Sequence, residues 1–189
     1  MARQAEPHLR WLPAAAGLAL AVPAIAQAAQ FATLEEAAQR AFPEAAAFRD
    51  ALVQASPDDL RALAALGGAA PRATSWHARV ALDAAGHVLG VTVADGVIGK
   101  FELIDYAVAL GADGKVRAVE ILNYRESHGY EVKLPAWRRQ FVGKGPDAKL
   151  QVGDDIANIS GATLSCTHIA DGVRHLVALV ARLRATGRL

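Results

Sequence analysis

The chain has 189 residues, of which 53% are hydrophobic and 21% charged, and its formal net charge is +1 at pH 7. This length and composition suit one sizeable hydrophobic core, and they exclude a disordered chain or a small disulfide scaffold. The near-neutral charge gives no broad positive surface, so nucleic acid is not expected as a partner. The only cysteine is Cys166, so neither an internal disulfide nor a CxxC metal or haem motif can form.

The first 28 residues have the pattern of a secretory signal peptide. Arg3 and Arg10 precede an apolar run that ends in the small residues AQAA. Pro13 and Pro23 interrupt this run, which is short for a membrane span of about 20 apolar residues. We therefore expect cleavage after residue 28 and a periplasmic or extracytoplasmic mature chain, either free or associated with the membrane.

Residues 29–72 are expected to form an N-terminal helical segment. The stretch 33–53 is rich in Ala, Leu, Glu and Arg, and Thr33 and Glu36 have the spacing of a capping box. A second, shorter helix is predicted after Ser56, which can cap it.

Alternating apolar residues between Trp76 and Ile121 predict two β-hairpins, with turns at Ala85-Gly86 and Asp113-Gly114. Apolar residues then recur at helical spacing after Thr163. The predicted fold class is α+β: an antiparallel sheet covered on one face by this C-terminal helix, with the N-terminal helices at the periphery. This domain is expected to span residues 73–189.

A run of small residues precedes the C-terminal helix. Gly161 and Ala162 would let a phosphate approach the unpaired backbone N–H groups of the helix start, and Thr163 adds a hydroxyl there. The alternative interpretation is structural, with Ser160 as the N-cap and Gly161 as a turn residue.

The sequence SGAT, followed by Leu164 and Ser165, resembles the flavinylation motif of the FMN-binding domain family. This family includes the covalent-FMN subunits of the sodium-pumping quinone reductase and of the Rnf ferredoxin-oxidising complex. The resemblance covers roughly residues 75–185 and implies that a flavin transferase esterifies Thr163 through the FMN phosphate. Ala157 departs from the motif, which usually has an acidic residue at this position.

The resemblance also implies contacts with the flavin in the loop after the second hairpin. Glu126 and Gly129 would face the flavin, and Gly129 would let the ring approach the backbone. Lys100 is a candidate for favouring reduced anionic flavin, and Tyr130 and Trp137 are candidates for stacking on the ring. Each of these has a plainer interpretation, either as a solvated surface residue or as core packing.

These features predict an exported electron-transfer flavoprotein with covalent FMN, which relays electrons to or from a membrane-bound redox partner and needs no catalytic side chain of its own. One alternative is a secreted binding domain, without covalent flavin, that holds a free phosphate-bearing ligand. A serine or threonine hydrolase that uses His168 or His175 is a third interpretation. The spacing of His and Cys residues indicates no metal site.

Overall fold

Six strands form one antiparallel sheet in the computed structural model, which describes residues 29–189. The predicted signal peptide, residues 1–28, lies outside the described residues. The strand order across the sheet is β1-β6-β5-β4-β3-β2. The strands are β1 (Ala29–Gln30), β2 (Ala47–Gln54), β3 (Ser75–Leu82), β4 (Val88–Ile98), β5 (Leu103–Gly111) and β6 (Val116–Tyr124).

Both predicted hairpins are confirmed, because β3 pairs with β4 and β5 pairs with β6. The first turn is fixed by Asp83, whose Oδ1 accepts hydrogen bonds of 2.8 Å from the backbone N–H groups of Ala85 and His87. A further hairpin joins β4 to β5 through a tight turn, in which the Gly99 N–H donates to the Glu102 carbonyl at 2.9 Å. This turn places Lys100 and Phe101 at one end of the central strands β4 and β5.

The helix predicted over 33–53 is only partly correct. Helix α1 spans Leu34–Ala41, with the predicted capping box between Thr33 and Glu36, and the chain leaves the helix at Phe42. Because the next residue, Pro43, disfavours helical backbone before it, the helix ends there. The rest of the stretch forms strand β2, whose pairing with β3 overrides its helical composition.

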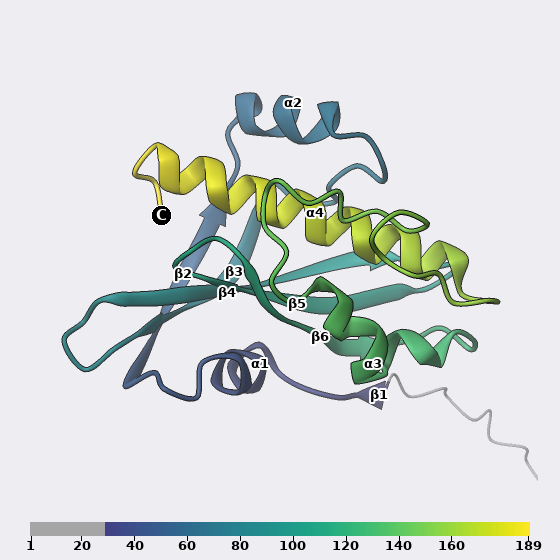
Figure 1. Ribbon diagram of the computed structural model, residues 1–189, viewed down its shortest axis with the longest axis horizontal. Helices are drawn as coiled ribbons and strands as arrows, with labels where there is room; N and C mark the ends of the chain where they lie inside the picture. The colour runs from purple at the N-terminus through teal and green to yellow at the C-terminus, as the bar shows by residue number, and fades with distance from the viewer. Residues whose placement is uncertain (1–28) are drawn as a thin grey trace, which may run out of the picture.

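Helix α4 (Thr163–Ala185) crosses one face of the sheet, as predicted (Figure 1). It packs on the large apolar residues of β4 and β5. Helix and sheet come closest at Gly172, where an added Cβ would lie 1.9 Å from the Tyr106 hydroxyl. Glycine is therefore required at this position for the helix to pack on the strand.

Helix α1 lies on the opposite face of the sheet (Figure 1). Side chains of β5 alternate between the two faces, so Tyr106 and Val108 meet α4 while Ala107 and Ala109 meet the α1 region. The α+β architecture with α4 as a cover is confirmed, and α1 adds a cover to the second face.

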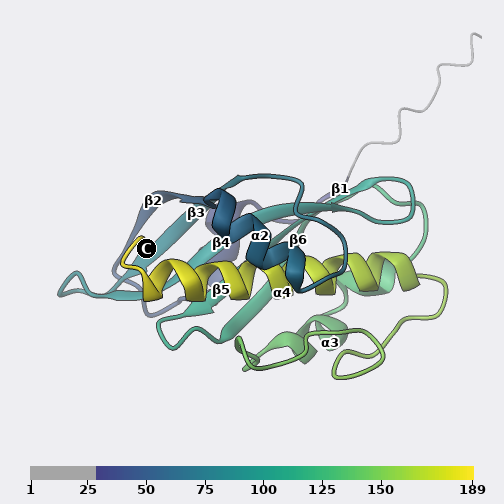
Figure 2. The same cartoon turned by 90° about the horizontal axis from the view of Figure 1, so that it is seen from above.

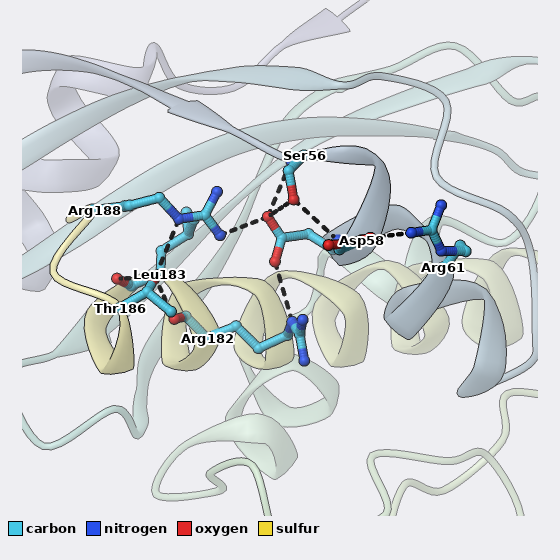
Figure 3. Close-up of polar contacts among 8 residues, drawn as sticks. Ser56, Asp58, Arg61, Arg182, Leu183, Thr186 and Arg188 are labelled. Carbon is cyan, nitrogen blue, oxygen red and sulfur yellow. Dashed lines mark hydrogen bonds and ion pairs between the residues drawn. The ribbon is translucent and has the colours of Figure 1, made fainter.

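Helix α2 (Pro57–Ala65) packs on α4 on the side away from the sheet (Figures 1 and 2). Asp59, in its first turn, is only 1% exposed. Its carboxylate accepts hydrogen bonds from Arg182 Nε at 3.1 Å and from an Arg188 Nη at 2.6 Å. Figure 3 shows Arg182, in the last turn of α4, and Arg188, in the segment that follows the helix, both reaching towards the start of α2 near Ser56.

The polar segment after β6 folds into short helical turns that pack against the sheet. Trp137 and Phe141 are buried edge to face with ring centroids 5.2 Å apart, and Arg138 donates to the Val119 carbonyl of β6. These contacts fix the segment as a wall beside the start of α4. Its helices are η1 (Tyr130–Lys133), α3 (Pro135–Arg138) and η2 (Arg139–Phe141).

Candidate functional site

Helix α4 starts at Thr163, and Ala162 is its N-cap, with no side-chain capping hydrogen bond. The prediction that Ser160 caps this helix is wrong. Gly161 adopts a φ of 83°, and this left-handed residue turns the chain so that the helix begins three residues after Ser160. The N–H groups of the first turn have no partner within the helix, so they can bind an anion.

A cleft of about 440 Å³ opens beside this helix start. Three segments form it: the β4–β5 turn, the loop after β6 and the first residues of α4. The sheet order explains why they meet: β4, β5 and β6 are antiparallel neighbours, so the β4–β5 turn and the end of β6 lie at the same end of these strands. The cleft is lined by Lys100, Phe101, Glu126, Ser127, His128, Gly161, Ala162, Thr163, Leu164 and Ser165.

Most of the residues predicted from the SGAT motif and its resemblance therefore lie together, along with Lys100 and Glu126. Gly129 lies behind the cleft, where an added Cβ would be 2.8 Å from the Cβ of Ala162. Tyr130 contacts Tyr124, with ring centroids 5.5 Å apart, and Trp137 is buried against Phe141. Gly129 thus packs against Ala162 of the cleft lining without lining the cleft itself, and Tyr130, Trp137 and the exposed Ser160 are not among the lining residues either.

Thr163 presents an exposed hydroxyl to the cleft, and its nearest polar partner is a residue that sequence reasoning missed. The side-chain amide of Asn158 donates a hydrogen bond of 3.0 Å to the Thr163 Oγ. An Asn five residues before a Thr gives no recognisable pattern in the sequence, because the loop between them has no fixed period. The turn at Gly161 creates this contact.

Ala157, where the motif has an acidic residue, lies exposed beside this loop. Its N–H donates to the Gln140 side chain at 2.7 Å, and its carbonyl accepts from the Trp137 indole at 2.7 Å. The backbone at this position is therefore held on both sides, while the side chain points into open space that a larger residue can occupy.

Glu126 is 5% exposed, and its Oε1 accepts hydrogen bonds from the backbone N–H groups of Phe101 at 2.6 Å and Glu102 at 3.0 Å. Burial on its own would raise the pKa of this carboxyl, but these donors, together with Lys100, hold the pKa below its ordinary value. Glu126 is therefore a carboxylate at neutral pH. Burial raises the pKa of the neighbouring Tyr124 to about 12, so this phenol stays neutral.

Each histidine of α4 has one ring nitrogen directed at a backbone carbonyl. His168 Nδ1 is 2.6 Å from the Ile98 carbonyl, and His175 Nε2 is 3.1 Å from the Gly67 carbonyl. A hydrolase needs a base hydrogen-bonded to its nucleophile, and among the residues that the structure describes neither histidine forms a hydrogen bond to a serine or threonine hydroxyl. Within residues 29–189, no group of three or more His, Cys, Asp or Glu side chains is arranged to hold a metal ion.

The helices of the described part of the chain include none with the length and apolar character of a membrane span. No curated protein matches the chain. Among solved structures, NqrC of Shewanella oneidensis is similar, with 17% identity and a TM-score of 0.53 over 78% of this chain and 88% of that chain. This likeness confirms the fold.

The residues that form the cleft lie within a match to a known protein family. Residues 99–178 match the FMN-binding domain family, from the glycine of the β4–β5 turn to the later turns of α4. This range contains every residue that lines the cleft. Residues 99–178 of this chain are therefore a domain of the FMN-binding domain family, as the resemblance predicted.

Proposed function

We propose that this protein is an exported electron-transfer flavoprotein that carries FMN esterified through its phosphate to Thr163. The observation that carries the proposal is the position of the Thr163 hydroxyl, which is exposed, lies at the first residue of a 23-residue helix and lines the cleft. A phosphate on this oxygen would lie at the positive end of the helix dipole, beside N–H groups that have no partner within the helix.

The cleft residues fit such a group in size and chemistry. A volume of about 440 Å³ is typical of sites for ligands of this size. Lys100 supplies a positive charge, and Phe101 and Leu164 expose 72% and 48% of their surface, which leaves apolar area for a flat ring. Gly161 and Ala162 add no bulk between the helix start and the phosphate.

FMN, when bound, supplies reversible one- and two-electron transfer. The chain then has only to bind the flavin, orient it and leave one edge accessible.

Export and the redox partner extend the proposal beyond the cleft. The signal-peptide pattern of residues 1–28 supports export. Outside the cytosol a bound flavin would be lost by dilution, and an ester bond prevents that loss. The partner we propose is a membrane-bound redox complex. Maturation would require a flavin transferase, which would form the bond between Thr163 Oγ and the FMN phosphate by cleaving a flavin dinucleotide donor and releasing its other nucleotide.

Intact mass after co-expression with a flavin transferase tests the linkage. The wild-type chain should gain the mass of one FMN less one water and stay yellow after denaturation. Thr163→Val should lose both properties, and Thr163→Ser should retain them in part because it keeps a hydroxyl. Thr167→Val, one helical turn further along α4, is the matched control and should be modified like the wild type.

Two results would contradict the proposal. A wild-type chain that releases its colour on denaturation and has the mass of the bare polypeptide would be a noncovalent phosphate-ligand binder. A chain that stays colourless with an active transferase would bind no flavin. Export is tested separately, by sequencing the N-terminus of the protein recovered from the periplasm.

A further inference from the structure

The buried carboxylate of Glu126 bonds to the backbone of the opposite cleft wall. Its Oε1 accepts from the N–H groups of Phe101 at 2.6 Å and Glu102 at 3.0 Å. Two consecutive amides of the β4–β5 turn thus converge on one oxygen, which comes from the loop after β6. Hydrogen bonds to a charged acceptor are the stronger kind, so this contact holds the turn firmly.

Gly99 permits this contact. A Cβ added to Gly99 would lie 2.6 Å from Glu126 Oε1, 2.8 Å from Ile104 Cδ1 and 2.9 Å from Ser165 Oγ. The first residue of the turn therefore fits against the carboxylate and the start of α4 only without a side chain. Gly99 is not among the glycines with a positive φ. The lack of space for a side chain, and not the backbone conformation, therefore explains why this residue is a glycine.

The same turn is held from α4 as well. His168 Nδ1 lies 2.6 Å from the carbonyl of Ile98, the last residue of β4, so the ring donates to the strand that enters the turn. Lys100 and Phe101 are themselves exposed and line the cleft. Their positions depend on the backbone that Glu126 and His168 hold.

We propose that Glu126 is a positioning residue that fixes the turn 99–102, and with it Lys100 and Phe101, as one wall of the flavin cleft. The inference rests on the proposed function for the identity of the ligand but not for the contact itself. It differs from the expectation that Glu126 acts on the flavin directly. The carboxylate acts through the turn, and Lys100 and Phe101 meet the ligand.

The first test needs no flavin and measures hydrogen exchange of the turn amides in the bare chain by NMR. Glu126→Ala should lower the protection of the Phe101 and Glu102 amides by about tenfold or more, because their acceptor is lost. Glu126→Gln keeps an oxygen acceptor and should retain most of the protection. Glu102→Ala, which removes an exposed carboxylate from the same turn, is the matched control and should match the wild type.

Unchanged protection of the Phe101 and Glu102 amides in Glu126→Ala would overturn the proposal. A Glu126→Ala chain that loses protection throughout β5 as well would have unfolded globally, so Gly99→Ala provides a second test. It keeps the carboxylate but displaces it, and it should lower protection at the same two amides, while Gly96→Ala, in the preceding strand β4, should not.

The second test uses the flavin-loaded chain and acrylamide quenching of flavin fluorescence, which reports access to the ring and not charge. Glu126→Ala and Gly99→Ala should each raise the quenching constant roughly twofold, because one wall of the cleft is loosened. Glu126→Gln should resemble the wild type. The proposal is wrong if the quenching constant of Gly99→Ala equals that of the wild type while that of Glu126→Gln differs. The carboxylate would then contact the flavin directly.

These tests separate the two proposals. Loss of amide protection in the bare chain supports the role of Glu126 even if Thr163 is never modified. Conversely, the wild-type chain could carry covalent flavin while Glu126→Ala leaves the exchange protection of the Phe101 and Glu102 amides unchanged. That result supports the proposed function and rejects this inference.

Discussion

The Asn158 side-chain amide donates a hydrogen bond of 3.0 Å to the hydroxyl oxygen of Thr163. The contact leaves the hydroxyl hydrogen free to point elsewhere and fixes the oxygen at the cleft wall. An attacking oxygen that is already oriented reacts faster, so Asn158 should matter for flavin attachment even though it takes no part in the bond.

Asn158→Ala should therefore slow flavinylation by about fivefold, which corresponds to the loss of about 1 kcal/mol of hydrogen bonding. The final extent should still reach the wild-type value, because Thr163 is unchanged. The measurement is a time course of intact mass with purified transferase. Asn123→Ala, on strand β6, is the control. Equal rates for Asn158→Ala and the wild type would show that the contact has no role in attachment.

Ala157→Asp should accelerate flavinylation when the transferase is limiting. The resemblance implies an acidic residue here, and the exposed side chain at this position has room for one. As a surface substitution on a backbone held by Gln140 and Trp137, it should change the free energy of unfolding by no more than about 0.5 kcal/mol. A competition assay between the two chains for one transferase would measure the gain, and a slower mutant would refute it.

Gly172→Ala should destabilise the fold by about 1–3 kcal/mol, because its Cβ would meet the Tyr106 hydroxyl at 1.9 Å. Tyr106→Phe removes that hydroxyl, although it also removes a 2.6 Å hydrogen bond to Asp95. The double mutant should therefore be more stable than the sum of the single effects predicts. Urea unfolding of the four chains measures this coupling, and strict additivity would show that α4 can shift to accommodate the methyl group.

Asp59→Ala should lower the free energy of unfolding by about 2–4 kcal/mol at neutral pH. The substitution removes the partner of Arg182 and Arg188 and the capping box with Ser56. Asp58→Ala is the matched control, because Asp58 is the preceding residue and pairs with Arg61 in an exposed ion pair (Figure 3). This control should cost less than about 1 kcal/mol. Similar losses for both variants would remove any special role for the buried carboxylate.

The stabilisation by Asp59 should depend on pH in one direction. The Arg188 hydrogen bond and the Ser56 N–H lower the pKa of Asp59 far below its ordinary value of 3.8. The native state thus favours the ionised form, so the stabilisation is complete above this value and falls as the pH drops below it. Urea titrations between neutral pH and about pH 3 should show the gap between wild type and Asp59→Ala narrowing only in acid. A difference in the free energy of unfolding that stays constant in acid would contradict the lowered pKa of Asp59.

Local patterns predicted much of the fold. The hairpins at Gly86 and Gly114 and the helix after Thr163 were found because alternation and helical spacing are visible within single segments. Strand β2 was missed because its residues favour a helix locally, and only pairing with β3 makes them a strand. The position of α1 on the second face was likewise hidden, since it depends on the alanines of β5 as well as on the helix.

The cleft was predictable where a motif marks it and not elsewhere. Thr163 and its small neighbours were found through the family resemblance, and the structure brings Glu126 and Lys100 to them. Phe101 carried no signal, because a single exposed phenylalanine in a turn has no pattern. The alternative interpretation of Ser160 as a cap rests on its residue type, but the left-handed turn at Gly161 moves the helix start beyond its reach.

Helix α4 begins at the cleft and ends where Arg182 and Arg188 meet α2, a length of roughly 35 Å at 1.5 Å per residue. Its middle is clamped between the sheet and α2. A flavin joined to its first residue would be held at the end of a packed helix. It could not move between donor and acceptor as a cofactor on a flexible linker does. Each redox partner would have to approach the same fixed point in turn, so the speed of electron relay would depend on how quickly one partner leaves and the next arrives.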